Sequence, residues 1–396
     1  MKKSLIALAA LAAVSAASAQ SSVTMYGLLD IGYGAQTTKS RDGTLAFKSR
    51  GVMDGANAGS RIGFRGTEDL GGGLKANFVF EQGVSPTSAN GFANRLSFGQ
   101  PIPGAPSAAS GLSGAGGGFS ANTNRQSYIG LSSATMGTLN IGYQYTNLYE
   151  LGTLSGYTVS SEGMPGGDKA HLFGLLTVGS ARANGLTYIS PDFSGFTVRA
   201  QYGASGFGSA LENQQTGASN LTSSGKRFGL MGKYANGPLS VALAYTTLTS
   251  QGNATAFAVP TVPVNPADRK SSMTQLGASY DFGVAKVAGT YLKAKNGGVS
   301  TSLTLNNSYT AYQIGVSVPF GAFVPFVAIG RAKNTENSLN TVAEDFKTAQ
   351  IGVRYSLSKR TTAYAMYGKT TDAAAPANPL AYSTDTKTIV GVSHSF

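Results

Sequence analysis

Apolar and polar residues alternate with a period of two along most of this 396-residue chain. In the stretch 74–81, one face carries Leu, Ala, Phe and Phe, and the other carries Lys, Asn, Val and Glu. The same alternation recurs at 196–202, 239–246, 275–282 and 349–357. A period of two puts successive side chains on opposite faces of a strand. The sequence therefore predicts many β-strands that are apolar on one face and polar on the other.

Two kinds of connection separate these predicted strands. Short turns, many rich in glycine, join some strand ends, for example at 67–73, 132–137, 190–195, 236–237 and 358–360. Long polar stretches join the others, at about 36–60, 82–123, 146–183, 204–225, 250–271, 294–308, 332–347 and 371–385. Eight long stretches and seven turns separate sixteen strands, near 22–35, 61–66, 74–81, 124–132, 138–145, 184–190, 196–203, 226–235, 238–249, 272–282, 284–293, 309–320, 322–331, 348–357, 361–370 and 386–396.

The strand lengths fit a membrane barrel. A strand tilted by about 45° gains roughly 2.3 Å of height per residue, so an apolar band about 25 Å tall takes around eleven residues. Aromatic residues also gather at strand ends, as in the girdles of such barrels: Tyr33, Tyr145, Tyr188, Phe193, Tyr202, Tyr234, Tyr280, Phe282 and Phe320. We therefore expect an all-β fold, a 16-stranded antiparallel transmembrane β-barrel with short periplasmic turns and long extracellular loops. The competing reading, a soluble β-sandwich, would keep its apolar face inside.

Composition narrows the class further. Only 12% of the residues are charged, about half of the ~25% that is usual in soluble domains, yet the mean hydropathy is −0.03. The chain has no cysteine, which excludes a disulfide framework and cysteine-based metal sites. With 19 Tyr and 19 Phe it is too aromatic for a disordered protein.

The two ends of the chain carry export and assembly signals. Lys2 and Lys3 precede a short apolar core at 5–14 and small residues at 17–19, which predicts a signal peptide over 1–19 cleaved between Ala19 and Gln20, and a barrel domain over 20–396. At the other end the chain alternates up to a terminal aromatic residue. We expect this strand to present an assembly signal to the barrel assembly machinery, carried by Val390, Val392, His394 and Phe396.

The sequence gives little support for a catalytic function. The chain has two histidines, His171 in a glycine-rich loop and His394 in the last strand, and no metal-ligand spacing. The glycine-rich stretch 112–118 does not lie between a strand and a helix, so phosphate cradling is not expected. The net charge of +12 comes without a compact basic and aromatic cluster, so we expect no nucleic-acid partner, and no cofactor or metal.

Five ordered blocks of this sequence resemble a known family. They are SSVTMYGLLDIGYG at 21–34, SRIGFRGTEDLGGGLKANFVFEQG at 60–83, NRQSYIGLSSATMGTLNIGYQY at 124–145, YISPDFSGFTVRAQYG at 188–203 and GVSHSF at 391–396. They look like the general outer-membrane porins of Gram-negative β-proteobacteria, of the neisserial, Burkholderia and Bordetella type. The resemblance implies a homotrimer of sixteen-stranded barrels in the outer membrane, in contact with its lipid and lipopolysaccharide. It also implies that the third long loop, about 146–183, folds inward and narrows the pore.

The resemblance also implies residues for the constriction. Arg61 matches a pore arginine of the family, and because Ile62 and Phe64 face lipid, Arg61 and Arg65 should face inward. Arg125 matches a second pore arginine, but it shares the phase of Ile129 and Leu131, so a bulge or a position beyond the membrane band is needed. Further candidates are Lys75 and Glu81 on the wall and Glu150, Glu162, Asp168 and Lys169 in the third loop. Tyr143 stands where the family often has arginine.

The expected function is passive diffusion of ions and small hydrophilic solutes through a water-filled pore, with a preference for anions. Fixed charges in a narrow channel between low-dielectric walls would set that preference. Two alternatives remain. A substrate-specific sugar or anion channel would show aromatic residues on inward positions, whereas most aromatics here fall on outward ones. A surface adhesin would carry a passenger region or repeats.

Overall fold

The computed structural model describes residues 22–40, 46–87, 124–154, 160–161, 163–167, 182–204, 224–251, 269–300, 303–336, 341–372 and 382–396. The elements, in chain order, are β1 (Ser22–Ser40), β2 (Ala46–Asp54), β3 (Arg61–Gly71), β4 (Leu74–Gly83), β5 (Asn124–Ser133), β6 (Gly137–Tyr145), α2 (Asn147–Leu154), β7 (Arg182–Ile189), β8 (Phe196–Ala204), β9 (Ser224–Asn236), β10 (Leu239–Gln251), β11 (Arg269–Asp281), β12 (Lys286–Ser300), β13 (Leu303–Ser317), β14 (Phe323–Glu336), β15 (Thr341–Ser356), β16 (Thr361–Asp372) and β17 (Tyr382–Ser395).

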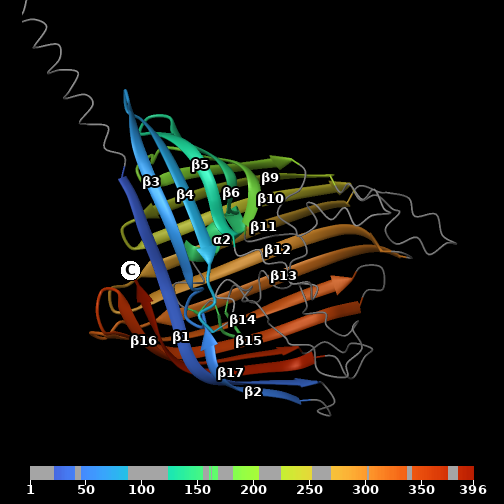
Figure 1. Cartoon of the computed structure of the whole chain (residues 1–396). Coiled ribbons are helices and arrows are strands. Elements are labelled where there is room, and N and C mark those ends of the chain that lie inside the picture. Colours follow the sequence, from blue (N-terminus) through green and yellow to red (C-terminus); the bar gives the residue numbers. More distant parts are fainter. Residues whose placement is uncertain are drawn as a thin grey trace, which may run out of the picture.

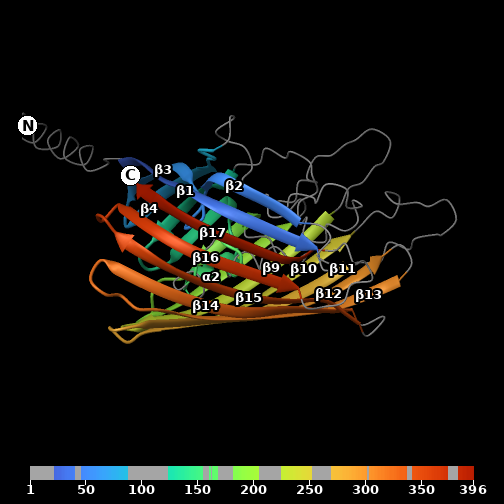
Figure 2. The ribbon, with the colours of Figure 1, turned by 90° about the horizontal axis from the view of Figure 1, so that it is seen from below.

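The strands form one closed antiparallel barrel. From β3 to β17 each strand pairs with its neighbour in sequence, and the barrel closes where Leu28–Ser40 of β1 pairs with β17. The other edge of β1 pairs first with β3 and then, from Ile31 onward, with β2. β2 and β3 therefore share one position in the barrel wall, so seventeen strand segments make the sixteen positions that the sequence predicts. Figures 1 and 2 show the strands wrapped around α2.

The two faces of the wall have the polarity of a membrane barrel. Outward side chains are large, apolar and exposed, as with Ile129 and Ile351, each 59% exposed. Many inward side chains are polar, as with Gln275 on β11, Gln313 on β13 and Gln350 on β15. Large apolar side chains on an outer surface are unfavourable in contact with water. Lipid must therefore cover this face of the barrel. No helix among the described residues is long and apolar enough to cross a membrane.

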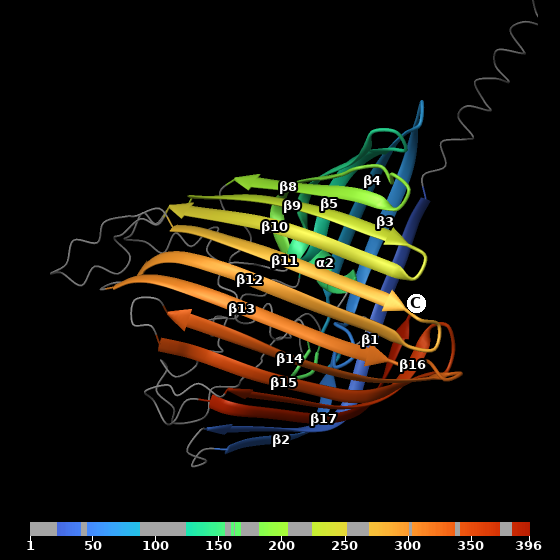
Figure 3. The ribbon, with the colours of Figure 1, turned by 180° about the vertical axis from the view of Figure 1, so that it is seen from behind.

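Tight turns occupy one end of the barrel. The β3–β4 turn needs left-handed backbone, and Gly72 and Gly73 supply it with φ of 59° and 80°. Gly237, with φ of 55°, does the same in the β9–β10 hairpin. Figure 3 shows β8–β15 side by side, with these turns at the same end as the C-terminus.

The strands differ from the sequence prediction mainly at the opposite end. The predicted loop 36–60 is wrong in part, because residues 36–40 continue β1 and residues 46–54 form β2. Long polar loops predicted at 294–308 and 332–347 are also largely strand, since β12 and β13 leave only 301–302 between them. The reason is chemical: the described outward side chains of these extensions are mostly basic or polar, as with Lys295, Lys333 and Lys347, so the outward apolar residues that mark a membrane strand are missing.

Residues 55–60 interrupt the wall between β2 and β3. The carboxylate of Asp30, which is fully buried, holds this interruption: the backbone N–H groups of Asn57 and Ala58 donate to Oδ2 at 2.7 and 2.6 Å. The hydroxyl of Tyr364 on β16 donates to the other carboxylate oxygen at 2.5 Å. Asp30 thus ties β1, β16 and the 55–60 segment together at the seam where the barrel closes.

The predicted signal peptide and its cleavage site at Ala19 and Gln20 lie outside the described residues. The C-terminal strand is described to its end. Phe396 exchanges two backbone hydrogen bonds with Gly27, each 3.1 Å, and Val390 and Val392 face outward. His394 also lies on the outer surface, where its Nδ1 is 2.9 Å from the hydroxyl of Thr361.

Candidate functional site

The third long connection enters the barrel as the family resemblance implies, starting with α2. The helix begins after Thr146, whose carbonyl accepts the Glu150 N–H at 3.0 Å. The Asn147 N–H, which a helix leaves unpaired, donates to the Gln201 side chain on β8 at 2.9 Å. Glu150 lies in the first turn, where a carboxylate favours the helix dipole.

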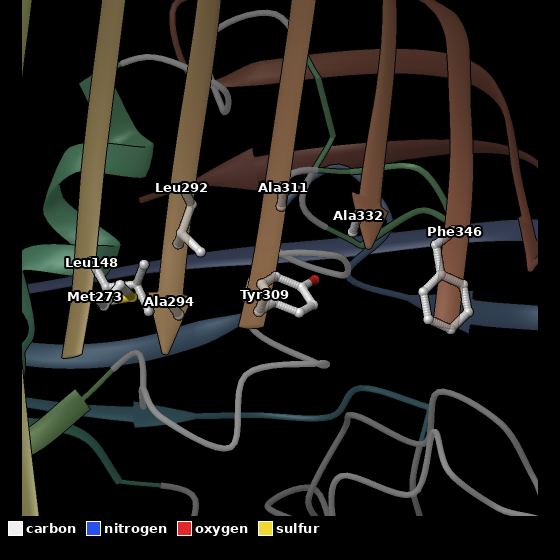
Figure 4. Packing of buried hydrophobic residues seen from close by; sticks show 8 residues of the cluster. All are labelled: Leu148, Met273, Leu292, Ala294, Tyr309, Ala311, Ala332 and Phe346. Atoms are coloured by element: carbon white, nitrogen blue, oxygen red, sulfur yellow. The ribbon is translucent and has the colours of Figure 1, made fainter. Parts of the chain in front are cut away.

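Apolar side chains fix α2 to the inner wall. Leu148 packs in a cluster of buried residues that extends along the inside of β11–β15, shown in Figure 4: Met273, Leu292, Ala294, Tyr309, Ala311, Ala332 and Phe346. Leu151 packs with Met231, Ala242 and Ala244 on β9 and β10. The helix therefore covers an apolar strip of the inner wall, and a cavity lies beside it, lined by residues of β1 and β3–β6.

A second part of the connection, residues 160–167, is bound to the inner face of β13 and β15. The Gln350 side chain donates to the carbonyls of Ser161, Met164 and Pro165 at 3.1–3.2 Å and accepts the Ser161 N–H at 2.8 Å. The Arg354 guanidinium donates to the Ser160 carbonyl at 2.7 Å. The Ser161 hydroxyl and the Gly163 N–H both donate to the carbonyl of Ala56, so this segment also rests on the 55–60 interruption.

Glu81 is the centre of the charged cluster that lies beside this inward connection. Its carboxylate accepts from Arg125 Nε at 2.6 Å, from the Tyr145 hydroxyl at 3.1 Å and from the Tyr26 hydroxyl at 3.0 Å. Arg61 Nε is 3.9 Å from the same carboxylate. A bulge explains how Arg125 reaches it: Glu81 pairs with Gln126, but Gln82 pairs with Asn124, so Arg125 is the extra residue.

Three more arginines complete the cluster from neighbouring strands. Arg199 on β8 forms an ion pair with Glu150 at 3.1 Å and donates to the Tyr145 carbonyl at 2.6 Å. Arg182 on β7 lies 5.0 Å above the Tyr145 ring, which itself stacks on Tyr149 with 4.0 Å between centroids. Arg65 on β3 lies 5.3 Å above the ring of Tyr26. Stacking on aromatic rings holds these guanidinium groups in place by cation–π attraction.

A cavity of about 550 Å³ adjoins this cluster, and its lining includes Tyr26, Arg61, Arg65, Glu81, Tyr128, Tyr145 and Tyr149. Five guanidinium groups stand against two carboxylates in this cluster, those of Glu81 and Glu150, which leaves an excess of three positive charges. The arrangement can attract and pass anions. The described residues contain no group of three His, Cys, Asp or Glu that could hold a metal ion.

The structure gathers most of the residues that the sequence singles out. Arg61, Arg65, Arg125 and Glu81 lie together on β3–β5, and Glu150 joins them from α2. Lys75 does not: it lies near the β3–β4 turn, opposite Asp69 and Ser132 in the strand register. Glu162, Asp168 and Lys169 lie outside the described residues.

Sequence reasoning missed several members of the cluster. It placed Tyr145 in an outer aromatic girdle, which is wrong, because the Tyr145 hydroxyl contacts Glu81 inside the barrel. It also placed the aromatics outward, whereas Tyr26, Tyr128 and Tyr149 line the cavity too. Arg199 could have been found, since it alternates inward with Thr197 and Gln201.

Comparison with known proteins agrees with this architecture. Residues 7–375 match the Gram-negative porin family. An outer membrane porin protein of Bordetella pertussis is 30% identical over an alignment that covers 100% of both chains. The solved structure of an anion-selective porin from Comamonas acidovorans is 23% identical, with a TM-score of 0.62, 95% of this chain covered and 100% of that one. The trimer form of OmpT from Vibrio cholerae is 16% identical, with a TM-score of 0.60 and coverages of 95% and 99%.

Proposed function

Since this chain belongs to the family of Gram-negative porins, we propose that its outer-membrane barrel passes ions and small hydrophilic solutes by diffusion and prefers anions. The observation that supports the anion preference is the charge of the cluster, in which five arginines face two carboxylates. The likeness of the barrel to other porins supports a channel as such, and does not by itself give the sign of its selectivity.

The charged cluster acts through fixed groups. Arg65 and Arg182 are held on tyrosine rings, and Arg61, Arg125 and Arg199 are held by carboxylates, so little reorganisation is needed when an ion passes. Low-dielectric walls on both sides focus the field of these charges into the lumen. An anion that enters exchanges part of its hydration shell for guanidinium N–H donors, and it leaves readily because water still surrounds the rest.

The inward tyrosines do not turn the cavity into a stacking platform for one substrate. Arg65 covers the Tyr26 ring, and Arg182 and the neighbouring ring of Tyr149 cover Tyr145. These aromatic faces are already covered, so they hold the guanidinium groups in position and do not offer a surface for a sugar ring. This favours a general diffusion channel over a substrate-specific one, and we assign the chain no enzymatic activity.

Measurement of single-channel currents in planar bilayers tests the proposal. In a KCl gradient, the purified protein should give discrete openings and a reversal potential on the anion-selective side. A cation-selective reversal potential would contradict the charge argument, and an absence of openings would contradict the channel itself. Gln275, an inward neutral residue of β11, offers a control: Gln275→Asn should leave the reversal potential unchanged.

We further propose that the short side of the barrel packs in a homotrimer. β3–β8 have 8–11 residues each, whereas β9–β17 have 12–16. This short side presents outward apolar side chains, among them Phe64, Phe80 and Ile141. Crosslinking in native outer membranes should trap three copies. Ile141→Lys should release monomers, while the equivalent change at Ile351 on the tall side should not.

The remaining expectations from the sequence also stand as proposals. Residues 1–19 direct export and are removed, which N-terminal sequencing of the mature protein would verify. The last strand engages the barrel assembly machinery through the terminal Phe396. Deletion of that residue should lower the amount of folded barrel in the outer membrane, while a Phe396→Tyr variant should keep it.

A further inference from the structure

Two polar side chains that are buried behind the start of α2 lack hydrogen-bond partners. Asn147, the first residue of the helix, is fully buried, and neither Nδ2 nor Oδ1 of its side chain has a partner. Arg227 on β9 is 5% exposed, and its Nε–H donor is also without a partner. A buried polar group without a hydrogen bond costs free energy, and a buried charge without a partner costs more. Both side chains therefore indicate that this part of the wall binds a further species.

The strand register shows where the side chain of Asn147 lies. Gln201 on β8, Gly229 on β9 and Thr246 on β10 form one row across the strands of the inner wall. The backbone N–H of Asn147 donates to Gln201 Oε1 at 2.9 Å, and Asn147 Nδ2 lies 3.0 Å from the point where a Cβ of Gly229 would stand. The side chain of Asn147 therefore rests on Gly229, where a larger residue would crowd it.

Arg227 lies next to this place on the same face of β9. It precedes Gly229 by two residues, so its Cα is about 7 Å further along the strand, a gap that an arginine side chain can span. Its partner on β8 is Gly203, which has no side chain to compete for the space. Arg227 Nε can donate and Asn147 Oδ1 can accept, yet both are unpartnered, so the two side chains do not bind each other directly. A species bound between them would supply the acceptor that their N–H donors lack.

The charges around this place favour an anion. The guanidinium of Arg227 stays protonated, and of the ion pairs that the structure describes none involves it. The N-terminus of α2 adds about half a positive charge. Glu150, the carboxylate of the first turn, is bound to Arg199 at 3.1 Å. A cation that is buried without a carboxylate needs another counter-ion.

We propose that Arg227 and Asn147 bind a chloride ion behind the first turn of α2. Arg227 Nε and Asn147 Nδ2 donate to the ion, and the hydroxyl of Thr246, whose Oγ1 is 3.3 Å from the same Cβ point of Gly229, is placed to be a third donor. The side chains of all three donors are at most 5% exposed, so the ion gives up nearly all of its hydration shell, which costs a halide less than a phosphate or a sulfate.

The ion is a fixed part of the wall and not an ion in transit. It neutralises Arg227 and holds the start of α2 against β9 and β10, the strands that the helix contacts there. The site therefore goes beyond the proposed diffusion of solutes, because it makes the seating of the inward connection depend on chloride.

Replacement of chloride in solutions of the purified full-length protein tests the proposal. The unfolding temperature is followed by circular dichroism while KCl replaces potassium gluconate at constant ionic strength. We expect the wild-type unfolding temperature to rise with chloride, because a ligand that binds the folded state alone stabilises it. Arg227→Gln should abolish this rise. The matched control, Lys233→Gln, removes the same charge from the same face of β9 about 20 Å away and should keep it.

A carboxylate placed in the site provides a second variant. Asn147→Asp puts a fixed negative charge where we assign the ion, at the end of α2 that favours it. In gluconate this variant should unfold at about the temperature that the wild type reaches in chloride, and chloride should not raise it further. If Arg227 lay out of reach, the new carboxylate would have no partner, and the variant would be less stable than the wild type in both salts. That result would overturn the proposal.

Crystals soaked in KBr locate the ion directly. An anomalous bromide peak between Arg227 and Asn147 is expected in the wild type and not in Arg227→Gln. Equal wild-type stability in both salts without a bromide peak would mean that water occupies the place. Stabilisation by sulfate and not by chloride would make it an oxyanion site. Both results overturn the proposal.

The channel assay keeps this proposal separate from the preceding one. Chloride-dependent stability together with an absent or cation-selective wild-type current would contradict the channel proposal and leave the chloride site intact. Anion-selective currents together with stability that ignores chloride would remove the chloride site and leave the channel proposal intact.

Discussion

Neutralisation of Arg65 should reduce anion preference without disturbing the fold. The side chain is exposed to the lumen, and its guanidinium lies over the Tyr26 ring. Among the described ion pairs, none involves Arg65, so Arg65→Gln leaves no carboxylate of the described residues without its partner. Glutamine keeps most of the length and the polarity of the side chain. The change therefore removes one fixed charge from an excess of three and little else.

The size of the effect follows from Coulomb's law. At about 6 Å in water, the attraction between a passing ion and one fixed unit charge is roughly 0.7 kcal/mol. In ~0.1 M salt, with a Debye length of about 10 Å, screening leaves roughly 0.4 kcal/mol. This energy enriches anions about twofold and depletes cations about twofold, because 1.4 kcal/mol is tenfold. Loss of the charge should thus lower the anion-to-cation permeability ratio about fourfold.

Salt provides an internal check on this reasoning. In ~1 M salt the Debye length is about 3 Å, and the same charge should change the permeability ratio by less than about 1.5-fold. Reversal potentials are therefore measured for wild type and Arg65→Gln in KCl gradients centred on both concentrations. A pore that selects by size or by dehydration alone would show no such dependence on ionic strength.

The control variant is Lys359→Gln, which removes the same charge from the β15–β16 turn. It should leave the permeability ratio within experimental error of the wild type. The argument fails if Arg65→Gln matches Lys359→Gln at low salt, since Arg65 would then lie off the ion path. It fails equally if the two variants shift together, because the overall charge of the protein would then govern selectivity.

Three further predictions concern the residues around the lumen. Glu81→Gln should raise the anion preference by about the same factor by which loss of an arginine lowers it. Its unfolding temperature should fall, because Arg125 loses a buried charged partner. An unchanged reversal potential would show that the charge of Glu81 does not act on passing ions. Gln350→Leu removes four hydrogen bonds to residues 160–167, worth about 0.5–1.5 kcal/mol each. The segment should then leave the wall more often, so single-channel currents should become noisier and larger. Quiet currents of wild-type size would contradict the anchoring role of Gln350. Asp30→Asn leaves donors of the 55–60 segment without a full acceptor and should cost about 1–3 kcal/mol in urea unfolding; wild-type stability would show that the segment is held by other contacts.

The fold was readable from the sequence wherever a strand has lipid on one face. At 276–282 and 349–357, outward apolar residues alternate with small or polar ones, and the structure has β11 and β15 there. The alternation disappears above the lipid, because water and headgroups then contact the outer face. Lys48 and Arg50 point outward on β2 just as Val52 does, yet their polarity made the segment look like a loop.

The site was only partly readable, because it depends on register and on contacts between distant segments. Alternation correctly sent Arg61 and Arg65 inward, but the bulge that brings Arg125 to Glu81 is a difference of one residue between paired strands. Tyr145 was misplaced because a tyrosine at a strand end fits an aromatic girdle as well as a lumen. Tyr145 faces the lumen because α2 packs inside the barrel, where Tyr149 stacks on Tyr145 and Glu150 pairs with Arg199.

Net charge, which composition gives, does not distinguish charges on the outer surface of the barrel from charges in the lumen. A formal net charge of +12 would be a reason to expect anion selectivity if most cations lined the lumen. Instead eleven lysines and arginines point outward at the end of the barrel opposite the tight turns, away from passing ions: Lys39, Lys48, Arg50, Lys226, Lys270, Lys293, Lys295, Arg331, Lys333, Lys347 and Lys369. The excess of three positive charges in the charged cluster is set by a different group of residues, on β3–β8 and α2. Two chains of this fold with equal net charge could therefore differ in selectivity. A charged residue moved by a single position along a strand changes from the outer face of the barrel to the lumen face, where it acts on passing ions.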